Sequence, residues 1–203
     1  MTKIESLIER AKKNPKRIVL PETNDERVIK AVKRIVSEKI AETVLIDTPA
    51  KYPRIDEIAQ KYYELKKHKG ISEADAKEAV LNDPLLLGFM MTRLGIADGI
   101  VAGASHTTRD VIRAAIGCLE IDRSAGIVSG AFIMERADSP YGASGLFIFS
   151  DCAVTPIPSA KQLTRIAILS SDFLKQLFGI QPKIAFLTYS SKGSAEGESV
   201  DRA

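Results

Sequence analysis

The chain has 203 residues, of which 45% are hydrophobic and 27% charged, and its formal net charge is +3. This balance is typical of a soluble globular protein with a sizeable core. The apolar runs at residues 85–91 and 126–134 are far shorter than the ~20 residues of a membrane span, so no membrane partner is expected, and no apolar signal region opens the chain. The small charge and scattered aromatic residues argue against a nucleic-acid partner but allow a small anionic ligand.

Hydrophobic periodicity predicts strands that alternate with helices. The predicted strands cover residues 17–20, 42–46, 98–102, 126–134, 145–149 and 183–187, with helices at 2–13, 23–35, 55–66, 72–81, 84–95, 108–119 and 159–179. This order indicates an α/β fold with a mainly parallel sheet and flanking helices. We expect an α/β domain I at residues 1–135 and the incomplete start of domain II at 136–203. The chain is expected to be truncated, because a helix should follow the last strand and cover the sheet.

Capping patterns set the predicted helix boundaries. Three capping boxes are Thr2 with Glu5, Thr23 with Glu26, and Ser159 with Gln162, while Pro84 suits a first helical position and Gly70 and Gly179 suit helix ends. The acidic residues Glu22, Asp25 and Glu26 are interpreted as charges at the N-terminus of a helix.

The first candidate site is the turn at residues 103–110. In open α/β sheets, ligands bind beyond the carboxyl ends of strands, where free backbone N–H groups at a helix start favour anions. Here a glycine allows a ligand to approach the backbone closely, and the hydroxyls of Thr107 and Thr108 can donate to phosphate. Arg113 can make a bidentate contact with the same phosphate. The alternative is ordinary helix capping beside a solvated arginine.

The second candidate site is the turn at residues 189–195, which combines Ser190, Lys192, Gly193 and Ser194 after a predicted strand. Such a turn can cradle phosphate. It is not a Walker A loop, because the GxxxxGK[ST] spacing is absent. The alternative is a flexible surface turn.

Other reactive side chains give weaker signals. His106 can orient a substrate or donate a hydrogen bond, although a lone histidine is usually structural. The basic run at residues 66–69 either meets ligand phosphates or ends a solvated helix. Cys118 and Cys152 stand far apart without a histidine cluster, so neither a disulfide nor a metal site is expected, and a cytoplasmic location is the simple interpretation.

Five ordered motifs resemble those of the phosphate acetyltransferase family, also called phosphotransacetylases. They are LPET at residues 20–23 with Arg27, YELKKHKG at 63–70, GASH at 103–106, Tyr141 and Gly142 with Gly145 and Asp151, and YSSKGSA at 189–195. The resemblance covers essentially the whole chain. It implies a two-domain fold like isocitrate and isopropylmalate dehydrogenases, a homodimer, and an active site in the cleft between the domains.

The resemblance also implies roles for individual residues. Arg113 falls on an active-site arginine that contacts phosphate or coenzyme A, and Thr107 and Thr108 stand where the family often has serines. Lys66 stands where a relative has an arginine implicated in coenzyme A binding. This replacement keeps the positive charge but loses the bidentate contact that an arginine can make. Ser139 stands near a position that can be cysteine, so no thiol nucleophile is implied.

The implied reaction exchanges an acetyl group between acetyl-CoA and inorganic phosphate, giving acetyl phosphate and CoA. A carboxylate takes the thiol proton of CoA, and the thiolate attacks acetyl phosphate. That carboxylate belongs to a C-terminal stretch of the family that this chain lacks, so the chain alone is expected to be weakly active or inactive. Coenzyme A is a substrate here, and neither a metal nor a tightly bound cofactor is implied.

Three alternatives remain. The same fold serves phosphate butyryltransferases, and it also occurs as a non-catalytic domain that senses acyl-CoA. A dehydrogenase of the related fold is disfavoured, because no GxGxxG follows the first strand.

Overall fold

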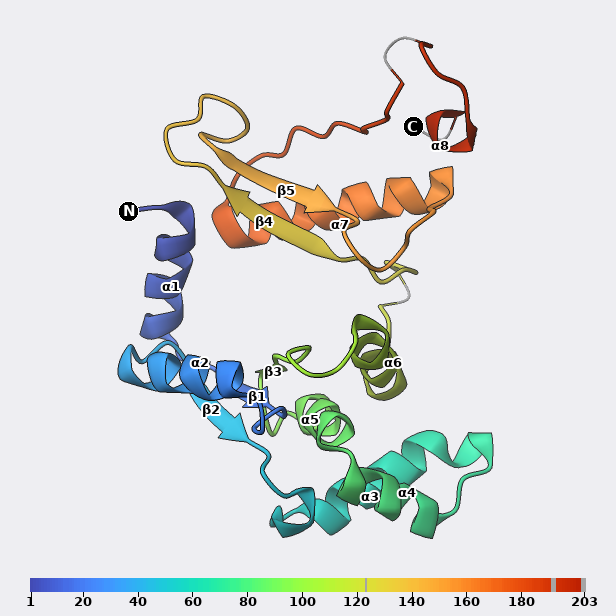
Figure 1. Ribbon diagram of the computed structural model, residues 1–203. Coiled ribbons are helices and arrows are strands. Elements are labelled where there is room, and N and C mark those ends of the chain that lie inside the picture. Colours follow the sequence, from blue (N-terminus) through green and yellow to red (C-terminus); the bar gives the residue numbers. More distant parts are fainter. Residues whose placement is uncertain (123, 191–192, 202–203) are drawn as a thin grey trace. The chain divides into compact units, whose positions relative to one another are not determined.

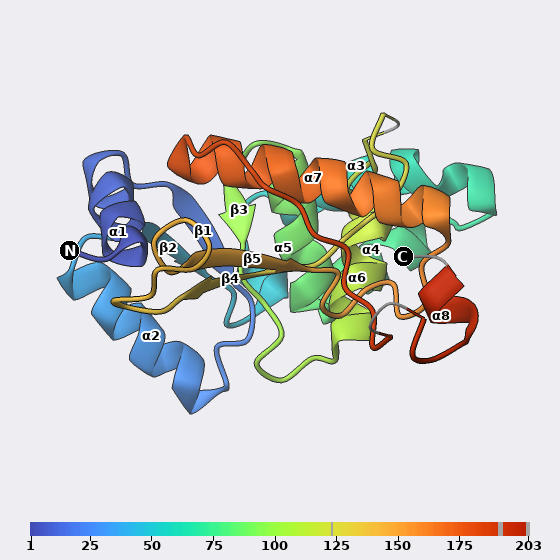
Figure 2. The ribbon, with the colours of Figure 1, turned by 90° about the horizontal axis from the view of Figure 1, so that it is seen from above.

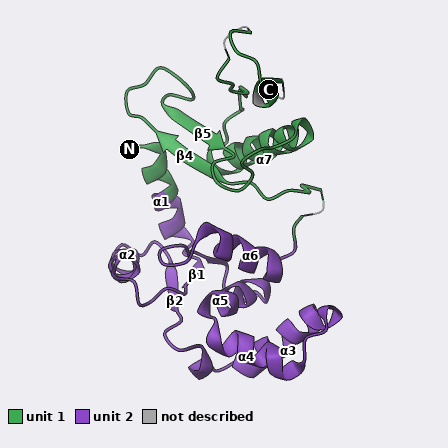
Figure 3. Cartoon of the chain, turned by 45° about the vertical axis from the view of Figure 1, so that its right-hand side comes forward, with its two compact units in different colours: residues 1–7, 121–203 green, residues 8–120 purple. Residues whose placement is uncertain are grey.

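The computed structural model describes residues 1–122, 124–190 and 193–201 and divides the chain into two compact units (Figure 3). One unit comprises residues 8–120, and the other comprises residues 1–7 and 121–203. The sequence suggested a division after residue 135. Residue 135 ends a strand, β4 (Ala131–Glu135), that pairs along its whole length with β5 (Leu146–Ser150).

The unit of residues 8–120 contains a parallel sheet with the strand order β2-β1-β3 (Figure 1). The central strand β1 (Arg17–Leu20) pairs with β2 (Glu42–Leu45) on one side and β3 (Gly99–Ile100) on the other. Strand β3 is shorter than predicted, but Asp98 and Val101 still bond to β1 through their backbone N–H groups. The predicted α/β fold with a parallel sheet and flanking helices is confirmed.

Helices of this unit follow the predicted order. They are α2 (Glu26–Ser37), α3 (Ile55–Lys66), α4 (Glu73–Asn82), α5 (Pro84–Arg93) and α6 (Thr108–Cys118), with short 3₁₀ helices η1 (Pro49–Lys51) and η2 (Lys67–Lys69). Helix α1 (Lys3–Lys13) begins in one unit and ends in the other.

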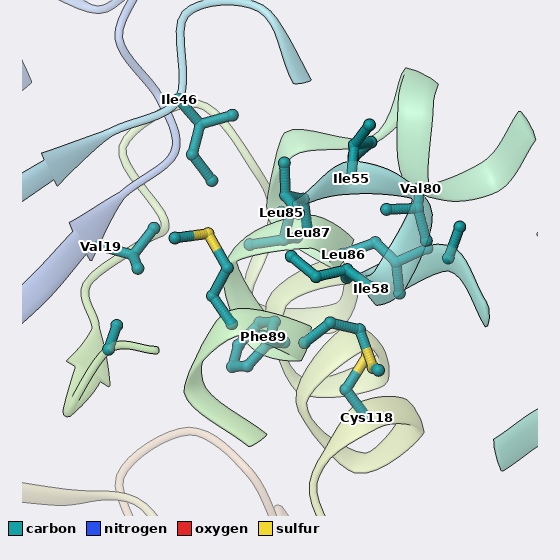
Figure 4. Close-up of a cluster of buried hydrophobic side chains, with 14 residues drawn as sticks. Val19, Ile46, Ile55, Ile58, Val80, Leu85, Leu86, Leu87, Phe89 and Cys118 are labelled. Carbon is teal, nitrogen blue, oxygen red and sulfur yellow. The ribbon is translucent and has the colours of Figure 1, made fainter. Parts of the chain in front are cut away.

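The core of this unit is built around α5 (Figure 4). All seven residues from Leu85 to Met91 are buried, as expected of a helix that is apolar on every side. Val19 of β1, Ile58 of α3 and Cys118 of α6 belong to the same cluster. Full burial of each large aliphatic side chain contributes about 1.5–3 kcal/mol. One core therefore holds both β1 and α6, which border the first candidate site.

The second unit contains an antiparallel hairpin of β4 and β5, with α7 (Ala160–Phe178) packed along β5 (Figure 2). A short helix, α8 (Glu198–Asp201), lies near the end of the chain. The Glu135 carboxylate accepts hydrogen bonds from the backbone N–H groups of Lys3 (2.6 Å) and Ile4 (2.9 Å), so it satisfies the first turn of α1. No described helix is long and apolar enough to cross a membrane.

Most predicted helix boundaries are confirmed, including the boxes at Thr2 and Ser159 and the left-handed glycines 70 and 179. The box at Thr23 is wrong. Asp25 caps α2 instead, because its carboxylate accepts from the Arg27 N–H group at 2.8 Å and also binds the Arg27 side chain. Several good capping residues stand in this loop, and local sequence could not choose among them.

The predicted strand at residues 183–187 is also wrong. These residues are not part of a sheet in the described chain, and their apolar side chains are open to solvent, with Leu187 79% exposed. A strand forms only where another strand satisfies its N–H and C=O groups. The apolar composition of residues 183–187 indicated a strand but could not supply that partner.

Candidate functional site

Two loops meet at one edge of the parallel sheet. One loop follows β1 and begins at Pro21, and the other follows β3 and runs into α6. Because β1 and β3 are parallel neighbours, their carboxyl ends lie side by side. These loops carry two of the sequence motifs, residues 20–23 and 103–106.

The Glu22 carboxylate joins the two loops. Its Oε2 accepts from the N–H groups of Gly103 and Ala104, each at 2.8 Å. Its Oε1 accepts from the N–H groups of Ser105 and His106, both at 2.8 Å, from the Ser105 hydroxyl at 3.1 Å, and pairs with His106 Nδ1 at 2.8 Å. The side chain is only 2% exposed. Successive backbone N–H groups thus form a nest around an internal anion.

These hydrogen bonds keep Glu22 ionised. Burial by itself raises the pKa of the carboxyl group, but the hydrogen bonds from Ser105, Ala104 and His106 outweigh it and lower the pKa from 4.5 to about 2. The interpretation of Glu22 as a helix-terminal charge is therefore wrong. Its position directly after a central strand, at the ligand-binding edge, was the signal that sequence reasoning missed.

Arg27 supports the same turn from α2. Its guanidinium binds both oxygens of Asp25, at 3.0 and 2.7 Å, and also donates to the Ala104 carbonyl oxygen. The side-chain hydrogen bond from Arg27 is the main reason that the pKa of Asp25 is lowered to about 2. Glu22 and Arg27, which belong to the first motif, thus both hold the turn formed by the third motif at residues 103–106.

This arrangement corrects one expectation about the turn. The N–H groups of residues 103–106 were expected to be free for phosphate, but they are occupied by Glu22. Any ligand at this edge must therefore use groups further along, from His106 onward.

Those groups lie at the start of α6. The Thr107 hydroxyl caps the helix, accepting from the Asp110 N–H group at 3.2 Å and donating to the Asp110 carboxylate at 2.6 Å. Thr108 is exposed. Arg113 is 70% exposed, and its guanidinium lies 3.9 Å from Asp110 in a loose ion pair. Thr107 thus acts as a helix cap, whereas Thr108 and Arg113 present polar groups to solvent.

Lys66 lies at the other end of α6. It ends α3, and its Nζ lies beside Gly117 in the last turn of α6. Thr108 and Gly117 are nine residues apart, roughly 13 Å along a helix. Burial is the main cause that lowers the pKa of Lys66. A ligand that contacts both Lys66 and Thr108 must therefore be extended.

The second predicted turn belongs to the other compact unit. Ser190 is buried, and its hydroxyl accepts from the Ala195 N–H group at 3.0 Å, which closes the turn. Gly193 and Ser194 are exposed, and Gly193 has a φ of +79°. Lys192 lies outside the described residues. The phosphate-binding role of this turn stays a prediction.

The remaining motif shapes the hairpin. The Arg136 N–H group donates to the Gly145 carbonyl (2.9 Å), and the Gly145 N–H group donates to the Tyr141 carbonyl (2.8 Å). Asp151 accepts from the N–H groups of Ala153 and Val154, both at 2.8 Å. These contacts stabilise local backbone turns.

The Cys118 thiol, or a cluster of side chains able to hold a metal, would be a further candidate site among the described residues. Burial raises the pKa of Cys118 to about 11, so its thiol is protonated at neutral pH. Within residues 1–122, 124–190 and 193–201, no three His, Cys, Asp or Glu side chains gather as metal ligands. A hollow of about 280 Å³ between α3 and α4, lined by Asp56, Gln60 and Lys77, contains none of the predicted site residues.

Comparisons with known proteins agree along the whole chain. The family model described as Phosphate acetyl/butaryl transferase matches residues 2–54 and 46–203. The chain is 40% identical to a phosphate acetyltransferase of Thermoanaerobacterium thermosaccharolyticum and 36% identical to one of Clostridium acetobutylicum, each over all of this chain and 67% of the relative. A phosphotransacetylase structure from Streptococcus pyogenes aligns with a TM-score of 0.83 at 30% identity, covering 98% of this chain and 65% of that one. The chain thus spans about two thirds of the length of these relatives.

Proposed function

Since this chain belongs to the phosphate acetyl/butaryl transferase family, we propose that it is the N-terminal part of a phosphate acetyltransferase. The reaction interconverts acetyl-CoA and inorganic phosphate with acetyl phosphate and CoA. The observation that carries the proposal is the match of the entire chain to relatives with that name. The contact between two of the family-like motifs, in which Glu22 accepts hydrogen bonds from residues 103 and 104 at the edge of the parallel sheet, agrees with this proposal.

In the direction of acetyl-CoA synthesis, the CoA thiol loses its proton and the thiolate attacks the carbonyl carbon of acetyl phosphate. The new carbon–sulfur bond forms as the carbon–oxygen bond to phosphate breaks, and phosphate leaves with the bonding electrons. The proton acceptor is a carboxylate in the part of the relatives that this chain does not span. This chain contributes binding and charge stabilisation.

Arg113 is the residue proposed to contact the phosphate or CoA. Its guanidinium is exposed and only loosely paired, so it can form a two-pronged contact with phosphate oxygens. Thr107 and Thr108 stand at the start of the same helix, and Thr108 is the better donor because the hydroxyl of Thr107 caps α6. Lys66 is proposed to bind CoA, and Ser190, Lys192, Gly193 and Ser194 to bind phosphate.

Several finer features are proposed on the same family resemblance. They are an isocitrate/isopropylmalate dehydrogenase-like fold in two domains (1–135 and the start of a second at 136–203), truncation at the C-terminus, a homodimer, and a cytoplasmic location. CoA is a substrate rather than a tightly bound cofactor.

Phosphate butyryltransferase is the second candidate, because the matching family model includes both acyl groups. A non-catalytic domain that senses acyl-CoA is the third candidate, and it predicts binding of CoA without turnover.

The test of function measures acetyl-CoA formation from acetyl phosphate and CoA, with butyryl phosphate in a parallel assay. The 203-residue chain is compared with the protein made from the full natural coding sequence. We expect turnover of acetyl phosphate by the longer protein, because it contains the proton acceptor. Preference for butyryl phosphate would favour the second candidate, and CoA binding without turnover in both proteins would favour the sensing domain.

The role of Arg113 is tested by Arg113→Lys in the active protein. We expect kcat/KM to fall about 10- to 100-fold, because lysine keeps the charge but cannot form the fork. Arg34→Lys is the matched control, since Arg34 is an exposed helix residue paired with Glu38 at 2.7 Å. Unchanged kinetics in Arg113→Lys would remove Arg113 from the site.

A further inference from the structure

The Glu22 carboxylate fixes the protonation pattern of the His106 ring. An ionised carboxylate can only accept hydrogen bonds, so Nδ1, 2.8 Å from Glu22 Oε1, must carry a proton. In a neutral imidazole the other nitrogen, Nε2, then has a free lone pair. The His106 side chain is one-third exposed, at 33%, whereas Glu22 is buried. The ring therefore links a buried anion to the surface.

The carboxylate is also held in place. Four backbone N–H groups and the Ser105 hydroxyl bind it in addition to the ring. Rotation of the carboxylate would break several of these bonds inside a buried site, where unpaired polar groups are costly. The direction of the imidazole is therefore set by the fold, as is required of groups that must be preorganised.

Asp110 links the ring electrostatically to the exposed arginine of the candidate site. His106 directly precedes the N-cap residue of α6, and Asp110 is within electrostatic reach of both His106 and Arg113. Both residues lie at or beyond the carboxyl edge of β1 and β3, where open α/β sheets bind ligands.

Resting on the proposed function, we propose that Glu22 is a positioning residue and His106 a substrate-contact residue. Glu22 holds the ring so that Nε2 accepts a hydrogen bond from a proton-bearing group of the substrate. Two substrates offer such a group: the thiol of CoA and the P–OH of inorganic phosphate. No proton transfer is needed, because Nε2 orients the group through the hydrogen bond alone.

A purely structural role predicts different behaviour. In that case His106 only adds one more donor to Glu22, and its outward nitrogen contacts nothing. The substitution His106→Asn separates the two roles, because the asparagine amide can replace the Nδ1 donor but has no atom in the place of Nε2. Glu22→Gln tests the positioning, with Glu26→Gln as control, since Glu26 is an exposed carboxylate on α2.

The first measurement is the ¹⁵N NMR spectrum of the imidazoles. The chain has two histidines, so His68 serves as an internal reference and His106→Asn assigns the signals. We expect neutral His106 to be in the Nδ1–H form and to lose this preference in Glu22→Gln but not in Glu26→Gln. A His106 ring in the Nε2–H form, or one unaffected by Glu22→Gln, would overturn the positioning role.

Ligand addition identifies the substrate group. Inorganic phosphate and CoA are added to separate samples, and a shift of the His106 Nε2 signal names the ligand that supplies the proton. His68 is the unchanged reference for phosphate only, because it lies two residues from Lys66, which is proposed to bind CoA. No shift with either probe overturns the contact. These spectra do not depend on turnover. They therefore test the roles of Glu22 and His106 even if the acetyltransferase assay of the unsubstituted protein is negative and the proposed function fails.

Kinetics complete the test in the active protein. We expect His106→Asn to keep the unfolding midpoint of the parent and to lower kcat/KM about tenfold, the cost of one hydrogen bond. Glu22→Gln should lower kcat/KM as well, and Glu26→Gln should not. Full activity of His106→Asn would leave only the structural role and overturn the proposal.

Discussion

At the scale of single residues, Glu22 shows how a buried charge can be accommodated. Moving a carboxylate out of water is costly unless hydrogen bonds replace its hydration. Here six donors from four consecutive residues surround it, and four of them are backbone N–H groups. The backbone N–H groups of the loop after β3 thus stabilise the negative charge of a side chain in the loop after β1. The two loops therefore depend on each other for stability.

This low pKa predicts a specific dependence of stability on pH. The pKa of Glu22 is about 2 in the folded state, against an ordinary value of 4.5. Its contribution, on the order of 3 kcal/mol, is therefore present above about pH 5 and is lost as the pH falls toward 2. We expect the difference in unfolding free energy between the parent and Glu22→Gln to stay constant from pH 6 to about pH 5 and then to shrink steadily down to pH 3, as measured by urea denaturation.

Glu26→Gln provides the comparison for this experiment. Glu26 is exposed and forms only a 4.0 Å pair with Lys30, so its substitution should change stability little at any pH. A Glu22→Gln penalty that stays constant from pH 6 to pH 3 would contradict the low pKa of Glu22.

At the scale of elements, the β4–β5 hairpin depends on the backbone geometry of its connection. Gly145 has a φ of +86°, a region that disfavours residues with a Cβ atom. A Cβ atom at this position would also collide with the carbonyl oxygen of Arg136. The Arg136 N–H group already donates a hydrogen bond to the Gly145 carbonyl oxygen, so the backbone of Arg136 cannot easily move away from Gly145.

We expect Gly145→Ala to destabilise the protein by more than about 2 kcal/mol, because the clash adds to the 1–2 kcal/mol cost of left-handed backbone. The matched control is Gly179→Ala in the same unit. Gly179 also has a positive φ, +67°, but an added Cβ atom would meet no atom within 4 Å. Equal unfolding free energies for the two variants would show that the hairpin connection can adjust.

At the scale of the whole molecule, burial is uneven between the two units. Among the described residues, the buried hydrophobic side chains lie within 8–120 except for Leu146 and Ile166. The other unit instead exposes apolar side chains, among them Phe132 of β4 and Leu187. Since buried apolar area supplies most of the stability, the two units should differ in local stability.

Hydrogen–deuterium exchange read by mass spectrometry measures this difference. Amides of α5 and β1 should exchange slowest, near the rate of global unfolding, because they sit in the main core. Amides of β4, β5 and α7 should exchange faster at neutral pH. Equal protection in the two units would contradict the expectation that stability follows the buried apolar area.

Much of the fold was predictable because the deciding signals are local. Pro84 marked the start of the apolar helix around Leu87, and the boxes at Ser159 and Thr2 marked further helix starts that the structure confirms. Predictions were wrong where a residue had several options of similar energy. Thr23 and Asp25 both suit an N-cap, and the apolar residues 183–187 form a strand only with a partner.

The sequence by itself determined the order of helices and strands, the parallel sheet, and the likeness to a family of acyltransferases, because periodicity, capping and motifs are properties of neighbouring residues. Only the tertiary structure decided that Glu22 lies in the turn of residues 103–106, some eighty positions away, and therefore that this turn is filled by the chain's own carboxylate. The reason is physical: a buried charge is stable only where distant backbone groups converge on it, and pairing β1 with β3 is what brings those groups together.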